Sequence, residues 1–178
     1  MEIKETVFSG CYRIVPSIYK DCRGRFVKTI VREEYEKYEI DCDFSEEFYS
    51  QSKKGVLRGM HFQLPPYDHA KLVQCCDGRV MDVIVDLRKS SKTYGQHLVF
   101  HLDSDSPELI YIPKGVAHGF YTLSAKATMV YKTTAPHQPS HDTGILWNSI
   151  GVEWPNKTPI LSQRDKSFLP MKDFPAIF

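Results

Sequence analysis

The stretch that decides the fold reads Asp77-Gly-Arg-Val-Met-Asp-Val-Ile-Val-Asp-Leu87. An Asp-Gly pair is a strong turn signal, and the β-branched residues that follow it predict a strand over 79–87. Both alternating sets of side chains in this strand are mostly apolar, so we expect both of its faces to be buried. The pair at 77–78 predicts a hairpin between this strand and the preceding one.

Short segments of β-type composition recur along the rest of the chain, separated by Gly, Pro, Asp and Ser. A helix is predicted over 32–38, with a further helical turn near Ser167. Many short strands with frequent turns indicate an all-β sandwich or closed barrel. The other strands are expected at 24–31, 71–76, 96–102, 108–112 and 128–133.

The 178 residues suit one domain over 1–178 with a core of ordinary size. Lys and Arg number 23 and Asp and Glu number 22, which leaves a formal net charge of +1. This balance creates no long-range field, so we predict neither a nucleic-acid nor a membrane partner. Five cysteines without a Cys-x-x-Cys pair and an N-terminus without an apolar leader predict reduced thiols in a cytoplasmic protein.

The candidate functional stretch is Gly55-Val-Leu-Arg-Gly-Met-His-Phe-Gln63, and Lys71 follows eight residues later. It brings a His and two cations onto neighbouring strands, while Tyr131 and Asp165 are candidate partners downstream. A base, a cation, an acid and an anion are the parts needed to move a proton next to a carbonyl. A lone His in a strand is more often structural than catalytic. A catalytic interpretation of His61 therefore depends on the residues that accompany it.

Arg58 and His61 are separated by three positions, which in a regular strand sends their side chains to opposite faces. A bulge at Gly59 would re-aim one of them, and bulges are common beside active sites. We therefore expect a bulge if both residues serve one site.

A second motif reads Ile112-Pro-Lys-Gly-Val-Ala-His-Gly-Phe120, and its Pro-x-Gly-x-x-His spacing resembles the second half of the cupin signature. Metal-binding cupins supply His-x-His in the first half, whereas the matching place here reads His61-Phe-Gln63. A catalytic metal needs three protein ligands at once, so we predict no metal site. The remaining histidines are interpreted as surface or loop residues: His69, His97, His101, His137 and His141.

Together these segments resemble the nucleotide-sugar 3,5-epimerase family over about 21–165. The motifs that carry the resemblance are Asp21-Cys-Arg-Gly-Arg-Phe26, Arg58-Gly-Met-His-Phe-Gln63, Lys71-Leu-Val, Asp82-Val-Ile-Val-Asp-Leu-Arg88, Thr93-Tyr-Gly, Ile112 to Phe120, Tyr131-Lys-Thr-Thr134, Ile145-Leu-Trp-Asn148, Trp154-Pro155 and Leu161-Ser-Gln-Arg-Asp165. The resemblance implies a cupin-type double-stranded β-helix, or jelly roll. It also implies a short helix after the N-terminal strands, short C-terminal helical turns, a homodimer and catalysis without a cofactor.

The reaction so implied inverts C3, C5 or both in a 4-keto sugar linked to a nucleotide diphosphate. His61 would be the base, oriented by Asp165, Tyr131 the acid on the opposite face, and Lys71 the cation near the C4 oxygen. A hydrogen next to a ketone is acidic because its removal gives an enolate, so base and cation must act together. The implied substrate-binding residues are Arg23, Phe26, Lys28, Glu46, Phe48, Arg58, Gln63, His118 and Asp142.

Nucleotide-facing positions depart from the family pattern. Thymidine-linked members carry Gln-x-Asn where this chain has Glu46 and Phe48, and an acidic residue where it has Lys28. Their aromatic pair is replaced by Pro136-His137, and their Asp after Trp-Asn by Ser149. A carboxylate suits the two donors of guanine, so we expect a GDP-linked 4-keto heptose, as in capsule pathways, over a dTDP-linked hexose.

Two alternatives stay open. A cupin ketoisomerase would move the carbonyl from C4 to C3, but such relatives usually place paired histidines on the central strand. A non-catalytic sugar- or nucleotide-binding cupin would be expected to lack the base or the acid, and this chain has candidates for both in His61 and Tyr131.

Overall fold

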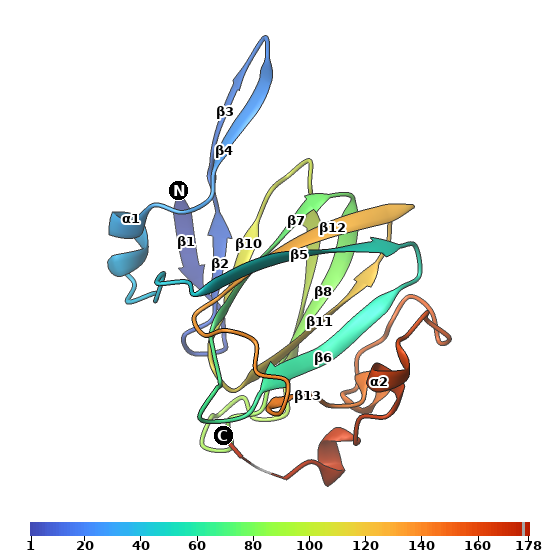
Figure 1. Ribbon diagram of the computed structural model, residues 1–178. Helices are drawn as coiled ribbons and strands as arrows, with labels where there is room; N and C mark the ends of the chain where they lie inside the picture. Colours follow the sequence, from blue (N-terminus) through green and yellow to red (C-terminus); the bar gives the residue numbers. More distant parts are fainter. Residues whose placement is uncertain (176) are drawn as a thin grey trace.

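The computed structural model describes residues 1–175 and 177–178 and contains two antiparallel β-sheets packed face to face (Figure 1). This arrangement confirms the predicted all-β jelly-roll class. The first sheet contains, in spatial order, β1 (Glu2–Glu5), β2 (Tyr12–Val15), β10 (Leu109–Ile112), β7 (Lys71–Asp77), β12 (Lys126–Thr133) and β5 (Glu46–Lys53). The second contains β13 (Asp142–Gly144), β6 (Leu57–Gln63), β11 (Val116–Thr122), β8 (Arg79–Asp86) and β9 (His97–Asp103).

Strand β8 is buried on both faces, as its composition predicts. Val80 and Ile84 pack between the two sheets, in the cluster that also holds Ile110 and Met129. The alternate set packs against the other side, where C-terminal segments of the chain cover the second sheet. The jelly roll therefore buries β8 between the opposite sheet and the C-terminal segments of the chain.

The turn at Asp77-Gly78 joins the two sheets, so the predicted hairpin is wrong. Strand β7 pairs with β10 and β12, whereas β8 pairs with β11 and β9. Gly78 has a φ of +80°, and a Cβ there would lie 2.1 Å from the carbonyl oxygen of Lys126. Glycine allows the chain to turn this close to β12. The same dipeptide can join strands of one sheet or of two, which sequence alone does not distinguish.

The helical elements are few and short. Helix α1 spans Arg32–Glu36, two residues less than the predicted 32–38, and 3-10 helices span Trp147–Ser149 and Met171–Asp173. The turn expected near Ser167 is helix α2, Gln163–Lys166. The side chain of Ser162 caps α2 by accepting the amide of Asp165 at 3.0 Å, as N-cap serines do. This cap fixes the position of Asp165.

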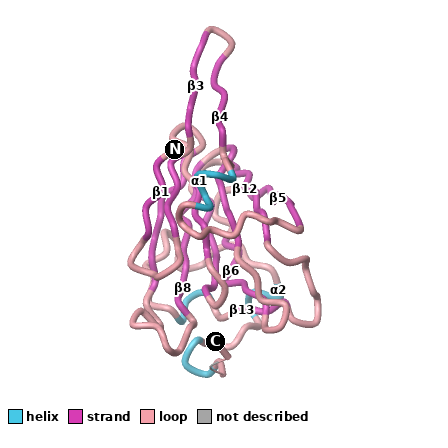
Figure 2. Tube along the Cα trace, turned by 90° about the vertical axis from the view of Figure 1, so that its left-hand side faces the viewer, coloured by secondary structure: helices cyan, strands magenta, loops and turns pink. Residues whose placement is uncertain are grey.

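A hairpin of β3 (Ser17–Asp21) and β4 (Gly24–Lys28) projects from the body of the molecule in both views (Figures 1 and 2). Strand β4 ends three residues before the predicted 24–31. The hairpin exposes 59% of Tyr19 and 62% of Phe26, so large apolar rings lie in solvent on a two-stranded arm.

All five cysteines are free thiols, with Cys11 and Cys75 buried. Within 1–175 and 177–178, none of the helices combines the length and the hydropathy needed to span a bilayer.

Candidate active site

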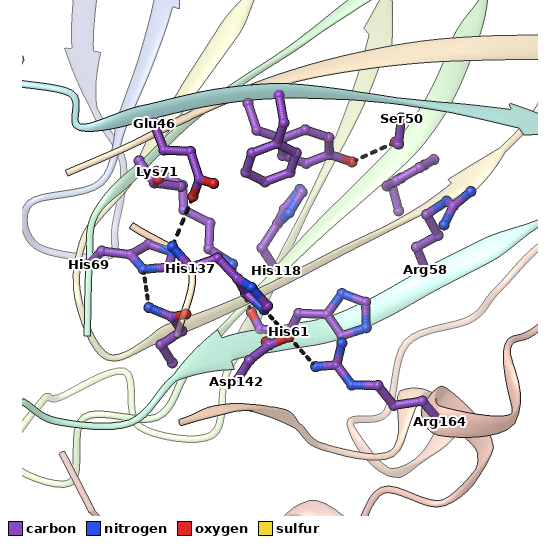
Figure 3. Close-up of a pocket in the computed structure, with 15 residues that line it drawn as sticks. Glu46, Ser50, Arg58, His61, His69, Lys71, His118, His137, Asp142 and Arg164 are labelled. Atoms are coloured by element: carbon purple, nitrogen blue, oxygen red, sulfur yellow. Dashed lines mark hydrogen bonds and ion pairs between the residues drawn. The ribbon is translucent and has the colours of Figure 1, made fainter. Parts of the chain in front are cut away.

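One cavity of about 370 Å³ lies between the inner faces of the two sheets (Figure 3). Strand alternation sends successive inward side chains of β5 and β12 into it from one wall, where β7 adds Lys71, and β6, β11 and β13 supply the other. Nine of the predicted site residues line it: Glu46, Phe48, Arg58, His61, Gln63, Lys71, His118, Tyr131 and Asp142.

The expected bulge at Gly59 is present. His61 pairs with His118 and Arg58 with Phe120, so β6 holds one extra residue between these pairs. Gly59 has a φ of +149°, and a Cβ there would lie 2.7 Å from the Cα of Gly119. The bulge needs glycine for both reasons, and it turns Arg58 and His61 into the same cavity.

His61 and Asp165 form the hydrogen-bonded pair that the sequence predicts. Nε2 of His61 lies 2.9 Å from Oδ1 of Asp165, and the freed amide of Gly59 donates to Oδ2 at 3.2 Å. Burial raises the pKa of Asp165, but the bonds from His61 and Gly59 outweigh it and hold the pKa below its usual value. Asp165 is then a carboxylate that accepts a hydrogen bond from the Nε2–H of His61, which leaves Nδ1 as the basic nitrogen.

Lys71 places its ammonium group in the same cavity, beside the backbone of His61. Its Nζ donates to the backbone carbonyl of His61 at 3.2 Å. Burial lowers the pKa of Lys71 to about 8, so the ammonium form predominates at neutral pH but gives up its proton more readily than an exposed lysine. A group of this kind can stabilise an oxyanion formed close to His61.

Tyr131 lies on the opposite wall of the cavity from His61, on β12 of the first sheet. Its hydroxyl is 3.2 Å from Oγ of Ser50. Burial raises its pKa well above the usual value for tyrosine, so the phenol stays protonated. The two walls therefore hold an imidazole and a protonated phenol on opposite sides of the cavity.

His118 is held by a fully buried carboxylate that the sequence analysis did not select. Its Nε2 lies 2.7 Å from Oδ2 of Asp82, and the side chains of the two residues are 4% and 0% exposed. Asp82 stands in β8, directly across from Phe120. The pair fixes the imidazole against the back of the cavity.

A network of charged and polar groups runs along the cavity from Glu46, at the upper left of Figure 3, to Arg164, at the lower right. Asp142 forms an ion pair with Arg164 at 2.8 Å and accepts a hydrogen bond from Nε2 of His137 at 3.1 Å. The backbone amide of His137 donates to Glu46 at 2.9 Å. The network joins β5, β13 and α2, so it ties the helix of Asp165 to the opposite sheet.

His69 and His137 lie in loops, as the sequence predicts, and both also line the cavity, which the sequence analysis did not anticipate. The amide nitrogen of Gln63 lies 2.9 Å from Nδ1 of His69 and also donates to the carbonyl of Tyr67 at 2.7 Å. Burial lowers the pKa of His69 to about 4, which keeps it neutral. Gln63, predicted to bind substrate, is thus engaged mainly with the protein.

Other lining residues were missed although the sequence held a signal for some of them. Ser50 lies two positions from Phe48 and Thr133 two positions from Tyr131, so strand alternation places each pair on one face. Arg164 adjoins Asp165 in the chain. His69 carried no comparable signal, because it lies in the loop before β7.

Three predicted binding residues, Arg23, Phe26 and Lys28, lie on the projecting hairpin and not at the cavity of the same chain. The guanidinium of Arg23 is 2.5 Å from Asp21 and its side chain is largely exposed. Among residues 1–175 and 177–178, no three His, Cys, Asp or Glu side chains are placed to share a metal ion.

Comparisons with known proteins identify the family of the chain. The sequence profile described as dTDP-4-dehydrorhamnose 3,5-epimerase matches residues 5–173. The dTDP-4-dehydrorhamnose 3,5-epimerase of Shigella flexneri is 42% identical over 168 residues, which cover 93% of each chain.

Solved structures match over nearly the whole chain. A 3,5-epimerase from Legionella pneumophila in complex with dTDP-4-keto-L-rhamnose superposes with a TM-score of 0.92 at 35% identity, covering 98% of this chain and 95% of that one. A 3′-monoepimerase from Streptomyces bikiniensis in complex with dTDP-quinovose gives a TM-score of 0.87 at 27% identity, covering 93% and 85%. The chain is accordingly an isomerase that epimerises a nucleotide-linked 4-keto sugar, and it belongs to the dTDP-4-dehydrorhamnose 3,5-epimerase family.

Proposed function

We propose that His61 removes a proton from a carbon next to the C4 ketone of a nucleotide-linked sugar and that Tyr131 returns one from the other face. One observation carries the proposal: the His61–Asp165 pair at 2.9 Å faces a cavity that Tyr131 lines from the opposite wall. Inversion needs a base and an acid on opposite faces of the ring. The enzyme uses no metal and no cofactor in this mechanism.

The first step breaks the C–H bond and forms an N–H bond at Nδ1 of His61. The electron pair moves into the carbonyl, and Lys71 stabilises the resulting oxyanion. The geometry supports this role, since Nζ of Lys71 lies 3.2 Å from the backbone oxygen of His61. Asp165 stabilises the imidazolium through Nε2.

The second step transfers the phenol proton of Tyr131 to the enolate carbon, and the oxyanion returns to a ketone. The phenolate of Tyr131 then takes a proton from water, and the imidazolium of His61 gives its proton to water, so both residues return to their starting states. Atoms and charges balance without a further reactant. His118, fixed by Asp82 at 2.7 Å, and Arg58 contact the substrate in this account.

We propose dTDP as the nucleotide. The expected preference for a GDP-linked heptose gains no support from the comparisons, because the Shigella and Legionella relatives are named for dTDP-linked sugars. The guanine interpretation of Glu46 is also weakened, since its Oε2 already accepts the amide of His137 at 2.9 Å. Phe48 stacks on Tyr131 and so occupies a position within the cavity.

We further propose that the enzyme is a homodimer in which the β3–β4 hairpin of one copy reaches the cavity of the other. This would bring Arg23, Phe26 and Lys28 to a nucleotide, and it would cover the exposed rings of Tyr19 and Phe26. Such an arrangement reconciles the predicted binding roles with the position of the hairpin. A cytoplasmic location without nucleic-acid or membrane partners stays a prediction from the sequence.

The test is incubation of the enzyme with a dTDP-linked 4-keto-6-deoxyhexose in D₂O, followed by NMR. Deuterium at C3, C5 or both, with inversion at the labelled carbon, is expected. A carbonyl found at C3 would instead support the ketoisomerase alternative. If neither inversion nor carbonyl migration occurs with dTDP- or GDP-linked sugars, the mechanism is rejected. Calorimetric titration with dTDP and GDP decides the nucleotide, and tighter binding of GDP would overturn that assignment.

A further inference from the structure

The ring of Tyr131 is restrained on three sides. Phe48 stacks on it with ring centroids 4.8 Å apart and planes 14° apart. Ser50 lies 3.2 Å from its hydroxyl, and His118 meets it edge-on with centroids 6.0 Å apart. Each contact alone would leave the ring some freedom, but together they define one position for the hydroxyl.

The restraints are themselves fixed by the fold. Phe48 and Tyr131 are direct antiparallel partners of β5 and β12, so their side chains project from the same face. Ser50 lies two residues further along β5, on that same face. On the third side, the bond between His118 and Asp82 prevents the imidazole from moving away.

We propose that Phe48 and Ser50 are positioning residues that confine the Tyr131 hydroxyl to one of the two carbons flanking the ketone, so that the enzyme inverts this carbon much faster than the other. The inference rests on the proposed function and deepens it. C3 and C5 lie on either side of C4, and a donor held in one place can approach one of them closely. To reach the second carbon, the ring of Tyr131 must break both its stacking on Phe48 and its hydrogen bond to Ser50.

The size of the bias follows from these two contacts. An offset aromatic pair and a hydrogen bond each contribute an amount equivalent to about 2- to 10-fold in an equilibrium constant. A shift of Tyr131 that breaks both therefore disfavours the second carbon by about 5- to 100-fold. The proton still comes from the phenol, which regains one from water, so the chemistry at either carbon is the same.

The experiment measures how much product is inverted at C3 and how much at C5, by NMR, during turnover of a dTDP-linked 4-keto-6-deoxyhexose. The unmodified enzyme is expected to favour one carbon by about 5-fold or more. Phe48→Leu removes the stack and Ser50→Ala the hydrogen bond, and each should move the ratio several-fold toward unity. Tyr49→Leu is the matched control, since Tyr49 neighbours Phe48 on β5 but is 69% exposed, and its ratio should equal that of the unmodified enzyme.

Equal inversion at both carbons in the unmodified enzyme would overturn the inference while leaving the epimerase mechanism intact. An unchanged ratio in both Phe48→Leu and Ser50→Ala would overturn it in the same way. Absence of any exchange at either carbon would instead reject the proposed function. Circular dichroism of each variant separates a loss of folding from a changed ratio, and Ser50→Ala, a small change, provides the test if Phe48→Leu does not fold.

Discussion

His61 and His118 are direct cross-strand partners on β6 and β11, and each hydrogen-bonds a buried carboxylate. The distances are 2.9 Å to Asp165 and 2.7 Å to Asp82. Direct antiparallel partners share a face, so both imidazoles face the cavity. The side chain of His61 is 28% exposed and that of His118 is 4% exposed, which makes His61 the imidazole that a substrate reaches most easily.

Replacement of Asp165 by Asn should lower kcat by about 10²- to 10⁴-fold. The amide keeps the shape of the side chain but cannot stabilise an imidazolium, and its NH₂ group favours the wrong tautomer of His61. Nucleotide affinity should stay within a few-fold of the original, as measured by calorimetry. Near-normal turnover in this variant would remove Asp165 from the mechanism.

Turnover should decline as the pH rises above about 8, because burial lowers the pKa of Lys71 to about 8. The ammonium is present below this pKa and lost above it, so stabilisation of the oxyanion is lost in the same direction. A pH profile of kcat measures the decline. In Lys71→Arg, whose guanidinium stays charged, turnover should be lower but the alkaline decline should disappear. An unchanged decline would assign it to another group.

Tyr131→Phe should separate exchange from inversion. His61 can still remove a proton and return one to the same face, so deuterium should enter from D₂O with the original configuration kept. Net inversion should fall by about 10²- to 10⁴-fold, because the opposite face has lost its donor. NMR of the product distinguishes the two outcomes. Inversion at the original rate would identify a different acid.

Gly59→Ala should destabilise the fold by more than about 1 kcal/mol and reduce turnover. The new Cβ would lie 2.7 Å from the Cα of Gly119 at a φ of +149°, which disturbs the bulge that brings Arg58 and His61 together. Gly151→Ala is the control, since its φ is +73° but no atom lies within 4 Å of the added Cβ. Its thermal midpoint should fall less, with turnover retained. Equal effects would show that close approach at Gly59 is unimportant.

The features that depend on local pattern could be predicted from the sequence. The parity conflict between Arg58 and His61 predicted the bulge, and the composition of 79–87 predicted a strand buried on both faces. Both rest on the fixed alternation of side chains along a strand. The partnership of His61 with Asp165 needed the family resemblance, because the two residues are 104 positions apart.

Features set by the pairing of distant strands could not be predicted. The Asp77-Gly78 dipeptide predicts a hairpin, but it fits a turn between two sheets equally well. Only the positions of the other strands decide between these two connections. Nothing in the local sequence distinguishes Asp82 from other strand residues. Its role depends on the pairing of β8 with β11, which places Nε2 of His118 2.7 Å from its carboxylate. His137 reaches the cavity and Asp142 because of the path of its loop, which the sequence does not specify.

His61→Asn tests the central claim most directly, because it removes the proposed base and keeps a polar side chain of similar size. The measurement is carbon-resolved deuterium incorporation from D₂O into a dTDP-linked 4-keto-6-deoxyhexose, with dTDP affinity as the control for an intact site. The account predicts that incorporation at both C3 and C5 falls by about 10²- to 10⁴-fold while dTDP binds almost as before. Incorporation at a near-normal rate would show that another group removes the proton and would contradict the account.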